Sequence, residues 1–363
     1  MPIPRKIRAI VADDSTLTRR AICRLLESDP QIEVVAIARD GADAVNMARE
    51  YRPDVITLDI NMPRLDGLSA LKQILTEGYC QAIVVSTHTP RNADATIEAL
   101  SLGAFDCVAK PDGDDSRDLQ AIAHELIEKI KAAAQADLKQ QSDDASARKP
   151  EAIFEPDFSA EQEPIDRGTP APTRAIAIGI STGGPTSIQK VLPRFPADLD
   201  AAIFLVQHMP ANFTSSFSKR LASKCSIQVE EARARQSIRS GVCYVGQGGR
   251  HMVPHRRSDS SITMRCPTQP QSLFVPSVDV MFRAVGKAFG PQNTIAILMT
   301  GIGHDGAESM LELKNGGAYT IAESEETAVV YGMPRAAYER GGVCEALPLH
   351  CIADAALNHF ATR

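Results

Sequence analysis

Three residues in the second half of the chain have types that could act together in nucleophilic catalysis. Ser181 lies in the segment GISTG at 179–183, which fits the G-x-S-x-G pattern that exposes a serine hydroxyl on a sharp turn between a strand and a helix. His208 ends the apolar run AAIFLVQH, and Asp305 lies in a glycine-rich loop after the run TIAILMT. A serine nucleophile needs a base, and the base needs a carboxylate that orients it. The sequence therefore predicts a Ser-His-Asp triad.

Each of these assignments has an alternative. The glycines at 179, 183 and 184 could form a phosphate-binding loop, and Asp305 could simply belong to a turn. The histidines that compete with His208 for the role of base are His251, His255 and His304. The alternative function is a non-catalytic nucleotide-binding or scaffold module, but no acidic residue ends the second strand, where a ribose would be held. The order Ser181, His208, Asp305 also differs from that of the α/β-hydrolases, in which the acid precedes the histidine.

Polar residues in the first half follow apolar runs in the same way. Asp13 and Asp14 follow the run IRAIVA, and Asp59 follows VITL. Ser86 and Lys110 end two later runs. Any one of these could be an ordinary polar residue at a strand end. Together, the carboxylates predict a Mg²⁺ site, and the hydroxyl and the ammonium beside it predict transfer of a phosphoryl group to a carboxylate.

The runs that must position these residues alternate with amphipathic stretches. In the first half five expected strands are each followed by an expected helix; the strands are 7–12, 32–38, 54–58, 82–86 and 105–109. Strand-like runs return at 175–180, 201–208, 227–232, 241–246, 294–300 and 318–322. Continuous apolar strands separated by helices indicate doubly wound parallel sheets, whose carboxyl ends share one edge. We therefore expect two α/β domains.

Length and composition limit the possible classes of protein. A chain of 363 residues with 44% hydrophobic residues has enough apolar material for more than one domain. The stretch 131–172 is polar, holds five basic and nine acidic residues, and is expected to be a linker. We therefore expect domains at 1–130 and 173–363. The net charge of −6 gives no basic domain for nucleic acid, and no apolar run is long enough for membrane insertion. A cytoplasmic location is expected.

The motifs VADDS, TLDINMPRLDG, VVS and VAKP resemble the receiver domain of two-component response regulators over about 120 residues. The resemblance implies a flavodoxin-like fold, a histidine kinase as phosphoryl donor, and Asp59 as the phosphorylated residue. It assigns Asp13, Asp14, Asp59 and the backbone of Asn61 to Mg²⁺, Ser86 to the switch hydroxyl, and Lys110 to the phosphoryl group. Cys107 stands where many receivers have an aromatic switch residue.

The motifs GISTGGP, VQHMPANFTSSFSKRL, PSVDVMF, LMTGIGHDGA and VVYGMPRAA resemble the catalytic domain of the chemotaxis protein-glutamate methylesterases, from about residue 175 to 353. The resemblance implies a Rossmann-like, three-layer domain in which Ser181 is the nucleophile, His208 the general base and Asp305 the orienting acid. Ile302 matches an oxyanion-hole position through its backbone N–H, and Thr182 a neighbouring active-site position.

The two resemblances together imply a phosphorylation-activated hydrolase. It would remove methyl groups from glutamate methyl esters of methyl-accepting chemoreceptors, release methanol, and deamidate glutamines on the same receptors. The catalytic domain would need no cofactor, and the unphosphorylated receiver would cover the active site. A receiver-driven DNA-binding regulator is a third option, but the chain has neither a helix-turn-helix signal nor a basic domain.

Overall fold

The computed structural model describes residues 5–87, 89–110, 116–143 and 171–362. The first half of the chain forms a five-stranded sheet of parallel strands in the order β2-β1-β3-β4-β5. Its strands are β1 (Ile7–Ala12), β2 (Ile32–Ala38), β3 (Val55–Leu58), β4 (Gln81–Ser86) and β5 (Asp106–Ala109). The helices are α1 (Thr16–Glu27), α2 (Gly41–Tyr51), α3 (Gly67–Thr76), α4 (Pro90–Leu102) and α5 (Ser116–Asp143). This domain confirms the predicted doubly wound sheet.

The helices of the first domain begin where the sequence supplies capping side chains. Ser15, Asp40, Asp66 and Thr89 each accept a hydrogen bond from a backbone N–H in the first turn of the helix that follows. Helix α5 continues to Asp143, so the first part of the stretch expected to be a linker belongs to this helix. Residues 144–170 of that stretch lie outside the described part of the chain.

The second half of the chain forms a seven-stranded parallel sheet in the order β14-β13-β12-β6-β7-β9-β8. Its strands are β6 (Ala175–Ile180), β7 (Ala202–Gln207), β8 (Gln228–Glu231), β9 (Val242–Val245), β12 (Thr294–Leu298), β13 (Tyr319–Glu323) and β14 (Glu345–Leu347). An antiparallel hairpin of β10 (Val253–Arg256) and β11 (Ile262–Arg265) stands apart from this sheet. The structure confirms the second predicted α/β domain.

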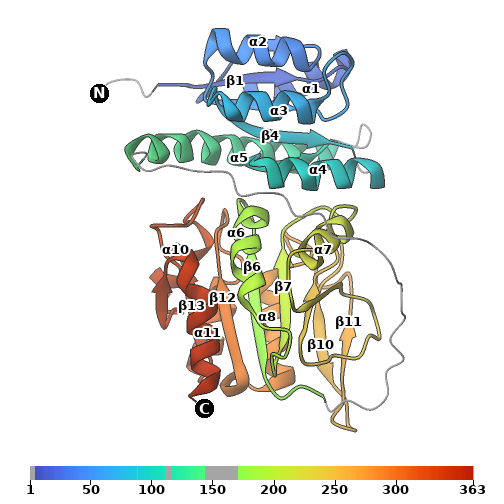
Figure 1. The fold of residues 1–363 in the computed structure, drawn as a ribbon, viewed down its shortest axis with the longest axis vertical. Helices are drawn as coiled ribbons and strands as arrows, with labels where there is room; N and C mark the ends of the chain where they lie inside the picture. The colour runs from blue at the N-terminus through green and yellow to red at the C-terminus, as the bar shows by residue number, and fades with distance from the viewer. Residues whose placement is uncertain (1–4, 88, 111–115, 144–170, 363) are drawn as a thin grey trace.

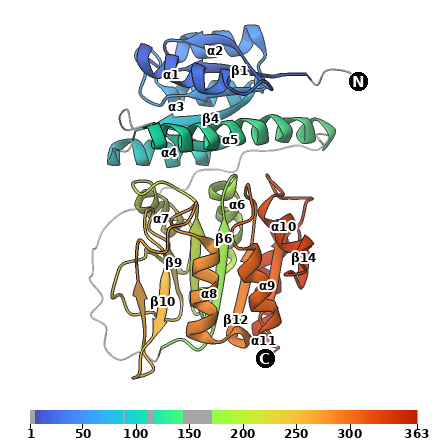
Figure 2. The same ribbon diagram turned by 180° about the vertical axis from the view of Figure 1, so that it is seen from behind.

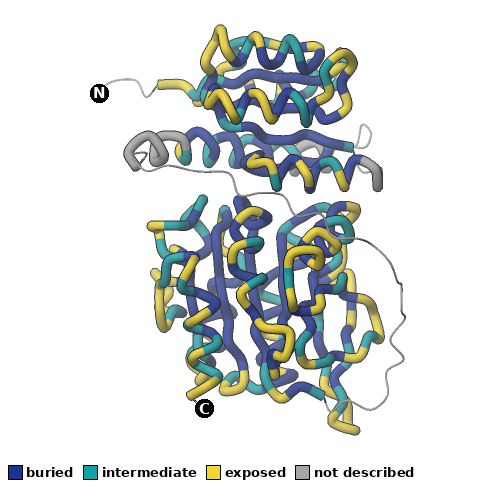
Figure 3. The backbone as a smooth tube through the Cα atoms, viewed as in Figure 1, coloured by how far each residue is buried: buried dark blue, intermediate teal, exposed yellow. Residues whose placement is uncertain are grey.

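Helices cover both faces of the larger sheet and form a three-layer domain (Figures 1 and 2). One face packs against α6 (Gly184–Val191), α7 (Thr214–Ala222) and α11 (Ile352–Ala361). The other packs against α8 (Val278–Phe289), α9 (Ala307–Asn315) and α10 (Met333–Glu339). The short 3₁₀ helices are η1 (Leu192–Arg194), η2 (Pro291–Asn293) and η3 (Leu349–Cys351). All residues of the central strands β6 and β7 are buried, which explains their unbroken apolar runs (Figure 3).

The first domain packs on the edge of the second domain from which α6 and α7 begin (Figure 1). Helix α4 contacts both of these helices, and the Thr186 hydroxyl donates a hydrogen bond of 3.3 Å to the Leu100 carbonyl. Val329 and Val330, in the loop after β13, pack against the apolar cluster of the first domain that includes α5. Within the described residues, no helix is long and apolar enough to cross a membrane.

We expect Gly67→Ala to destabilise the first domain by about 3 kcal/mol, because a Cβ at this position would lie 2.0 Å from the Asp59 carbonyl oxygen. The Gly67 N–H also donates to the Ile60 carbonyl at 2.8 Å, so the backbone cannot easily move away. Urea unfolding would measure the loss. Lys72→Ala, at an exposed position of the same helix, should change the free energy of unfolding by less than about 0.5 kcal/mol. Equal stability of the two variants would contradict the close approach.

Candidate active site and candidate phosphoryl-acceptor site

Three carboxylates meet at the carboxyl edge of the first sheet. Asp13 follows β1 and Asp59 follows β3; both are buried, whereas the neighbouring Asp14 is exposed. One oxygen from each of the three lies within 4.8 Å of the others. Asn61 lies in the loop after β3 with Asp59, and its backbone N–H is 3.4 Å from an oxygen of the Asp59 side chain. The carboxylates that the sequence predicted to converge are therefore together, and their hard oxygen atoms suit a divalent cation such as Mg²⁺.

Lys110 brings a positive charge to this cluster from the end of β5. Its ammonium nitrogen is 2.7 Å from an oxygen of Asp13 and 2.7 Å from an oxygen of Asp59. Burial disfavours the ammonium, but its hydrogen bonds to the two carboxylates outweigh this and raise the pKa of Lys110. The Lys110 N–H also donates to the Ser86 carbonyl at 2.8 Å, which places Ser86 on the neighbouring strand end. Lys110 therefore joins Asp13 and Asp59 in one cluster, next to the strand end that carries Ser86.

The turn that carries Ser181 is held by close packing around two glycines. Gly183 has φ of +75°, and a Cβ there would lie 2.6 Å from the Cβ of Val329. At Gly179 a Cβ would lie 2.3 Å from a methyl group of Val278, so β6 and α8 approach closely. Ser181 itself is only 7% exposed in this structure. The turn leads directly into α6, as the sequence pattern predicted.

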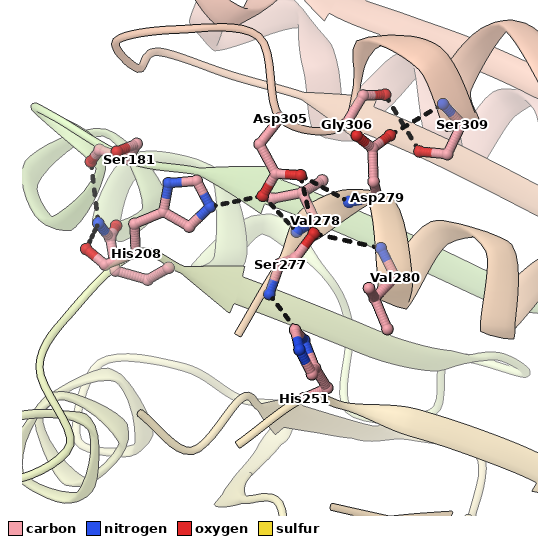
Figure 4. A network of polar contacts seen from close by, with 11 residues as sticks. Ser181, His208, His251, Ser277, Val278, Asp279, Val280, Asp305, Gly306 and Ser309 are labelled. Atoms are coloured by element: carbon pink, nitrogen blue, oxygen red, sulfur yellow. Dashed lines mark hydrogen bonds and ion pairs between the residues drawn. The ribbon is translucent and has the colours of Figure 1, made fainter. Parts of the chain in front are cut away.

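His208 lies at the end of β7, beside the serine turn. Its Nε2 is 2.8 Å from Oδ2 of Asp305, and the ring lies between Ser181 and Asp305 (Figure 4). Gln207 donates hydrogen bonds to the carbonyls of Ser181 and His208, which ties the ends of β6 and β7 together. The Nδ1 of His208 is buried and has no hydrogen-bond partner among the described residues. This nitrogen is therefore the one that could accept a proton.

The N-terminus of α8 holds the Asp305 carboxylate. Oδ1 accepts hydrogen bonds from the Ser277 hydroxyl at 2.8 Å and the Asp279 amide at 3.1 Å, and Oδ2 accepts one from the Val278 amide at 2.7 Å. Burial opposes ionisation, but the contacts with His208 and the two amides outweigh it and lower the pKa of Asp305 to about 2. The carboxylate is therefore ionised at neutral pH and can orient the imidazole.

The loop after β12 lies against the serine turn. A Cβ on Gly301, the residue before Ile302, would be 2.7 Å from the Cβ of Ser181. Thr182 is buried, and its backbone carbonyl accepts a hydrogen bond of 2.8 Å from the Thr300 hydroxyl. Thr182 follows Ser181 directly, and the loop that carries Ile302 approaches the same turn through Gly301.

The competing histidines have other positions. His251 is buried and accepts a hydrogen bond from the Ser277 amide through Nδ1, with Nε2 2.8 Å from the Pro270 carbonyl. His255 belongs to β10, and His304 is exposed. Of these four histidines, which all lie in the described part of the chain, His208 is the one whose ring hydrogen-bonds to the Asp305 carboxylate.

Sequence reasoning missed two residues that support the candidate triad. The Phe274 ring stacks on the imidazole of His208, with 4.0 Å between ring centroids and an angle of 7° between the planes. Ser277 is the N-cap of α8 and the hydroxyl donor to Asp305. The run PSVD before an amphipathic stretch is a helix-start signal that could have identified Ser277. The sequence around Phe274 contains no comparable signal.

Comparison with known proteins places both domains in described families. Residues 9–124 match the model of the response regulator receiver domain, and residues 176–356 match that of the CheB methylesterase. A protein of Syntrophomonas wolfei named protein-glutamate methylesterase/protein-glutamine glutaminase 3 is 46% identical over 96% of this chain and 97% of its own. A relative from Pyrococcus horikoshii with the same name, without the numeral, is 39% identical over 96% of this chain and 92% of its own.

Solved structures from Thermotoga maritima resemble the two domains separately. The crystal structure of the CheB methylesterase catalytic domain has 32% identity and a TM-score of 0.49, and covers 50% of this chain and 96% of its own. The crystal structure of the CheB response regulator domain has 44% identity and a TM-score of 0.34, and covers 36% of this chain and 98% of its own. The relatives that match nearly the whole chain show that it belongs to the family of protein-glutamate methylesterases/protein-glutamine glutaminases, with a receiver domain preceding a CheB methylesterase domain.

Proposed function

We propose that this protein is a phosphorylation-activated hydrolase that removes methyl groups from glutamate methyl esters on chemoreceptors and deamidates glutamines on the same receptors. The observation that carries the proposal is the pair His208 and Asp305, placed beside Ser181 at three strand ends. Relatives that match nearly the whole chain are named for both activities. These names and the methylesterase match favour an enzyme over a non-catalytic nucleotide-binding module.

The geometry supports a two-step acyl transfer. Nδ1 of His208 takes the proton of the Ser181 hydroxyl as Oγ attacks the ester carbonyl, while Asp305 holds the other ring nitrogen as the N–H form. The backbone N–H of Ile302 stabilises the oxyanion, with Thr182 beside it. The ester C–O bond then breaks, and methanol leaves with the proton from His208. Water attacks the acyl-enzyme by the same route and releases the glutamate carboxylate and free Ser181. For a glutamine substrate the leaving group is ammonia.

The receiver domain would regulate the hydrolase activity. We propose that a histidine kinase provides the phosphoryl group, that Asp59 accepts it, and that Lys110 and Ser86 contact the bound phosphoryl oxygens. Asp13, Asp14, Asp59 and the Asn61 carbonyl would hold Mg²⁺, which when bound neutralises charge on the phosphoryl group. The closely spaced carboxylate oxygens fit this ion.

Packing between the domains suggests how phosphorylation acts. Helix α4 lies against α6 and α7, and Val329 contacts both the serine turn and the first domain. Ser181 and the His208 side chain are buried in this arrangement. We propose that the unphosphorylated receiver covers the active site and that phosphorylation shifts the population toward an open arrangement.

We expect Ser181→Ala to lower the rate of methanol release from methylated receptors by about 10⁴-fold or more, because no other hydroxyl replaces the nucleophile. A serine-directed phosphonate should label the wild-type protein and leave this variant unlabelled. Ser258→Ala, at an exposed position in the β10–β11 turn, is the matched control and should keep the wild-type rate. Wild-type methanol release by Ser181→Ala would refute the triad.

We expect Asp59→Asn to keep the basal rate of methanol release and to lose the increase caused by a small phosphoramidate donor with Mg²⁺. The wild-type increase should be about 5- to 150-fold, the usual range for coupling between two sites. Glu50→Gln, at an exposed position on α2, should respond as the wild type does. Donor-dependent activation that persists in Asp59→Asn would exclude this residue as the acceptor.

We expect removal of residues 1–140 to raise the basal methanol-release rate to at least that of the phosphorylated full-length protein. The reason is that the truncation removes α4 from the edge that carries Ser181. The truncated protein retains the whole of the matched methylesterase region, and its folding can be checked by thermal unfolding. A basal rate equal to that of the unphosphorylated full-length protein would count against coverage by the receiver.

A further inference from the structure

A buried carboxyl group outside the candidate triad lies next to the serine turn. Glu323 is the last residue of β13 and has no exposed surface. Its Oε2 accepts a hydrogen bond of 2.9 Å from the Thr300 amide, and its Oε1 accepts one of 3.1 Å from the Thr327 hydroxyl. Neither the proposed chemistry nor the phosphoryl-acceptor site uses this residue.

Thr300 connects Glu323 to the nucleophile. The Thr300 carbonyl accepts a hydrogen bond of 2.9 Å from the Ser181 amide. The Thr300 hydroxyl donates to the Thr182 carbonyl at 2.8 Å and accepts from the Val330 amide at 2.9 Å. Thr300 therefore fixes the serine turn through its backbone and its side chain, and Gly301 and Ile302 follow it directly in the chain.

Within these contacts, Glu323 is the acceptor for the Thr300 N–H. A buried N–H without an acceptor is destabilising, because its desolvation is not compensated by a hydrogen bond. An apolar side chain at position 323 would therefore favour movement of the Thr300 peptide. Such movement would displace the Ser181 amide on one side and the Ile302 amide on the other. The Ser181 amide holds the turn that carries the nucleophilic hydroxyl, and the Ile302 amide is the proposed oxyanion donor, so both positions matter for the proposed acyl transfer.

The carboxyl group of Glu323 is in an environment that disfavours its charge. Burial raises the pKa of Glu323 from its ordinary value of 4.5 to about 7, although the Thr300 amide, the Thr327 hydroxyl and the ammonium of Lys190 on α6 favour ionisation. These groups come from the loop after β12, the turn after β13, and α6. Both the neutral and the ionised forms can accept the Thr300 hydrogen bond, and so can an amide oxygen.

We propose that Glu323 is a positioning residue for the hydrolytic reaction, which holds Thr300 and thereby fixes the turn of Ser181 and the Ile302 amide. The proposal rests on the proposed role of Ser181. We expect Glu323 to affect the rate of the chemical step and not receptor binding, because its side chain is fully buried.

The kinetic test compares Glu323→Leu, which fills the space but has no acceptor, with Glu323→Gln, which keeps one. For full-length protein activated by a phosphoramidate donor, we expect the leucine variant to lower kcat for methanol release about 10- to 100-fold, with KM changed less than about twofold. Labelling of Ser181 by a serine-directed phosphonate should slow in parallel. The glutamine variant should stay within about threefold of the wild type in both measurements.

The control is Glu326→Gln, at an exposed position in the same turn, which should match the wild type. All assays are made well below the unfolding temperature of each variant. If Glu323→Leu keeps the wild-type kcat and labelling rate, the proposal is wrong. It is also wrong if Glu323→Gln is as impaired as Glu323→Leu, because an amide acceptor should suffice.

Thermal unfolding tests the buried carboxyl independently of catalysis. Because the folded-state pKa is raised, the folded protein holds this proton more tightly, and the stability gained is fully present below pH 4.5 and is lost as the pH rises to about 7. Glu323→Gln has no such loss. Its Tm minus that of the wild type should therefore increase between pH 4.5 and 7 and stay constant above.

The same difference for Glu326→Gln should not change with pH. A Tm difference for Glu323→Gln that is also independent of pH would overturn the assignment of a buried, titrating carboxyl. The two proposals fail separately: full activity of Ser181→Ala would refute the proposed triad, whereas wild-type kcat and labelling in Glu323→Leu would refute the positioning role alone.

Discussion

Both domains depend on the geometry of parallel strands. Each strand in a parallel sheet must be followed by a crossover, so every carboxyl end lies at the same edge of the sheet. Residues far apart in the chain therefore meet there: Asp13 and Lys110 in the first domain, Ser181 and Asp305 in the second. The edge of the second sheet where the crossovers begin is also the edge on which the first domain packs. The candidate triad and the contact with the first domain thus lie on the same side of the second domain.

The geometry of parallel strands explains which elements and residues can be predicted from the sequence. Apolar runs identify strands that are buried on both faces, and polar residues at their ends identify candidate residues for both sites. The β10–β11 hairpin was missed because its strands are half-exposed and carry Arg256 and Arg265 among few apolar residues. Phe274 and Glu323 were missed because their contacts come from loops and strands that only tertiary packing brings together.

Two buried carboxyl groups at the same edge show how local donors determine ionisation. Asp305 receives two backbone amides, a hydroxyl and the His208 ring, and its pKa falls to about 2. Glu323 receives one amide and one hydroxyl, and burial raises its pKa to about 7. The difference follows from the number and charge of the hydrogen-bond donors, since both groups are withdrawn from water. A fold can therefore keep one carboxylate charged to orient a base and leave another close to neutrality as a hydrogen-bond acceptor.

The packing of Val329 bears on how the closed arrangement of the two domains depends on temperature. This side chain fills the space left by Gly183 and also contacts the apolar cluster of the first domain. Separation of the domains would expose it, together with other apolar surface, to water. Apolar contacts strengthen on warming from low temperature. We therefore expect the closed arrangement to be weakest in the cold, so that the basal activity relative to the phosphorylated state depends on the temperature at which the cell grows.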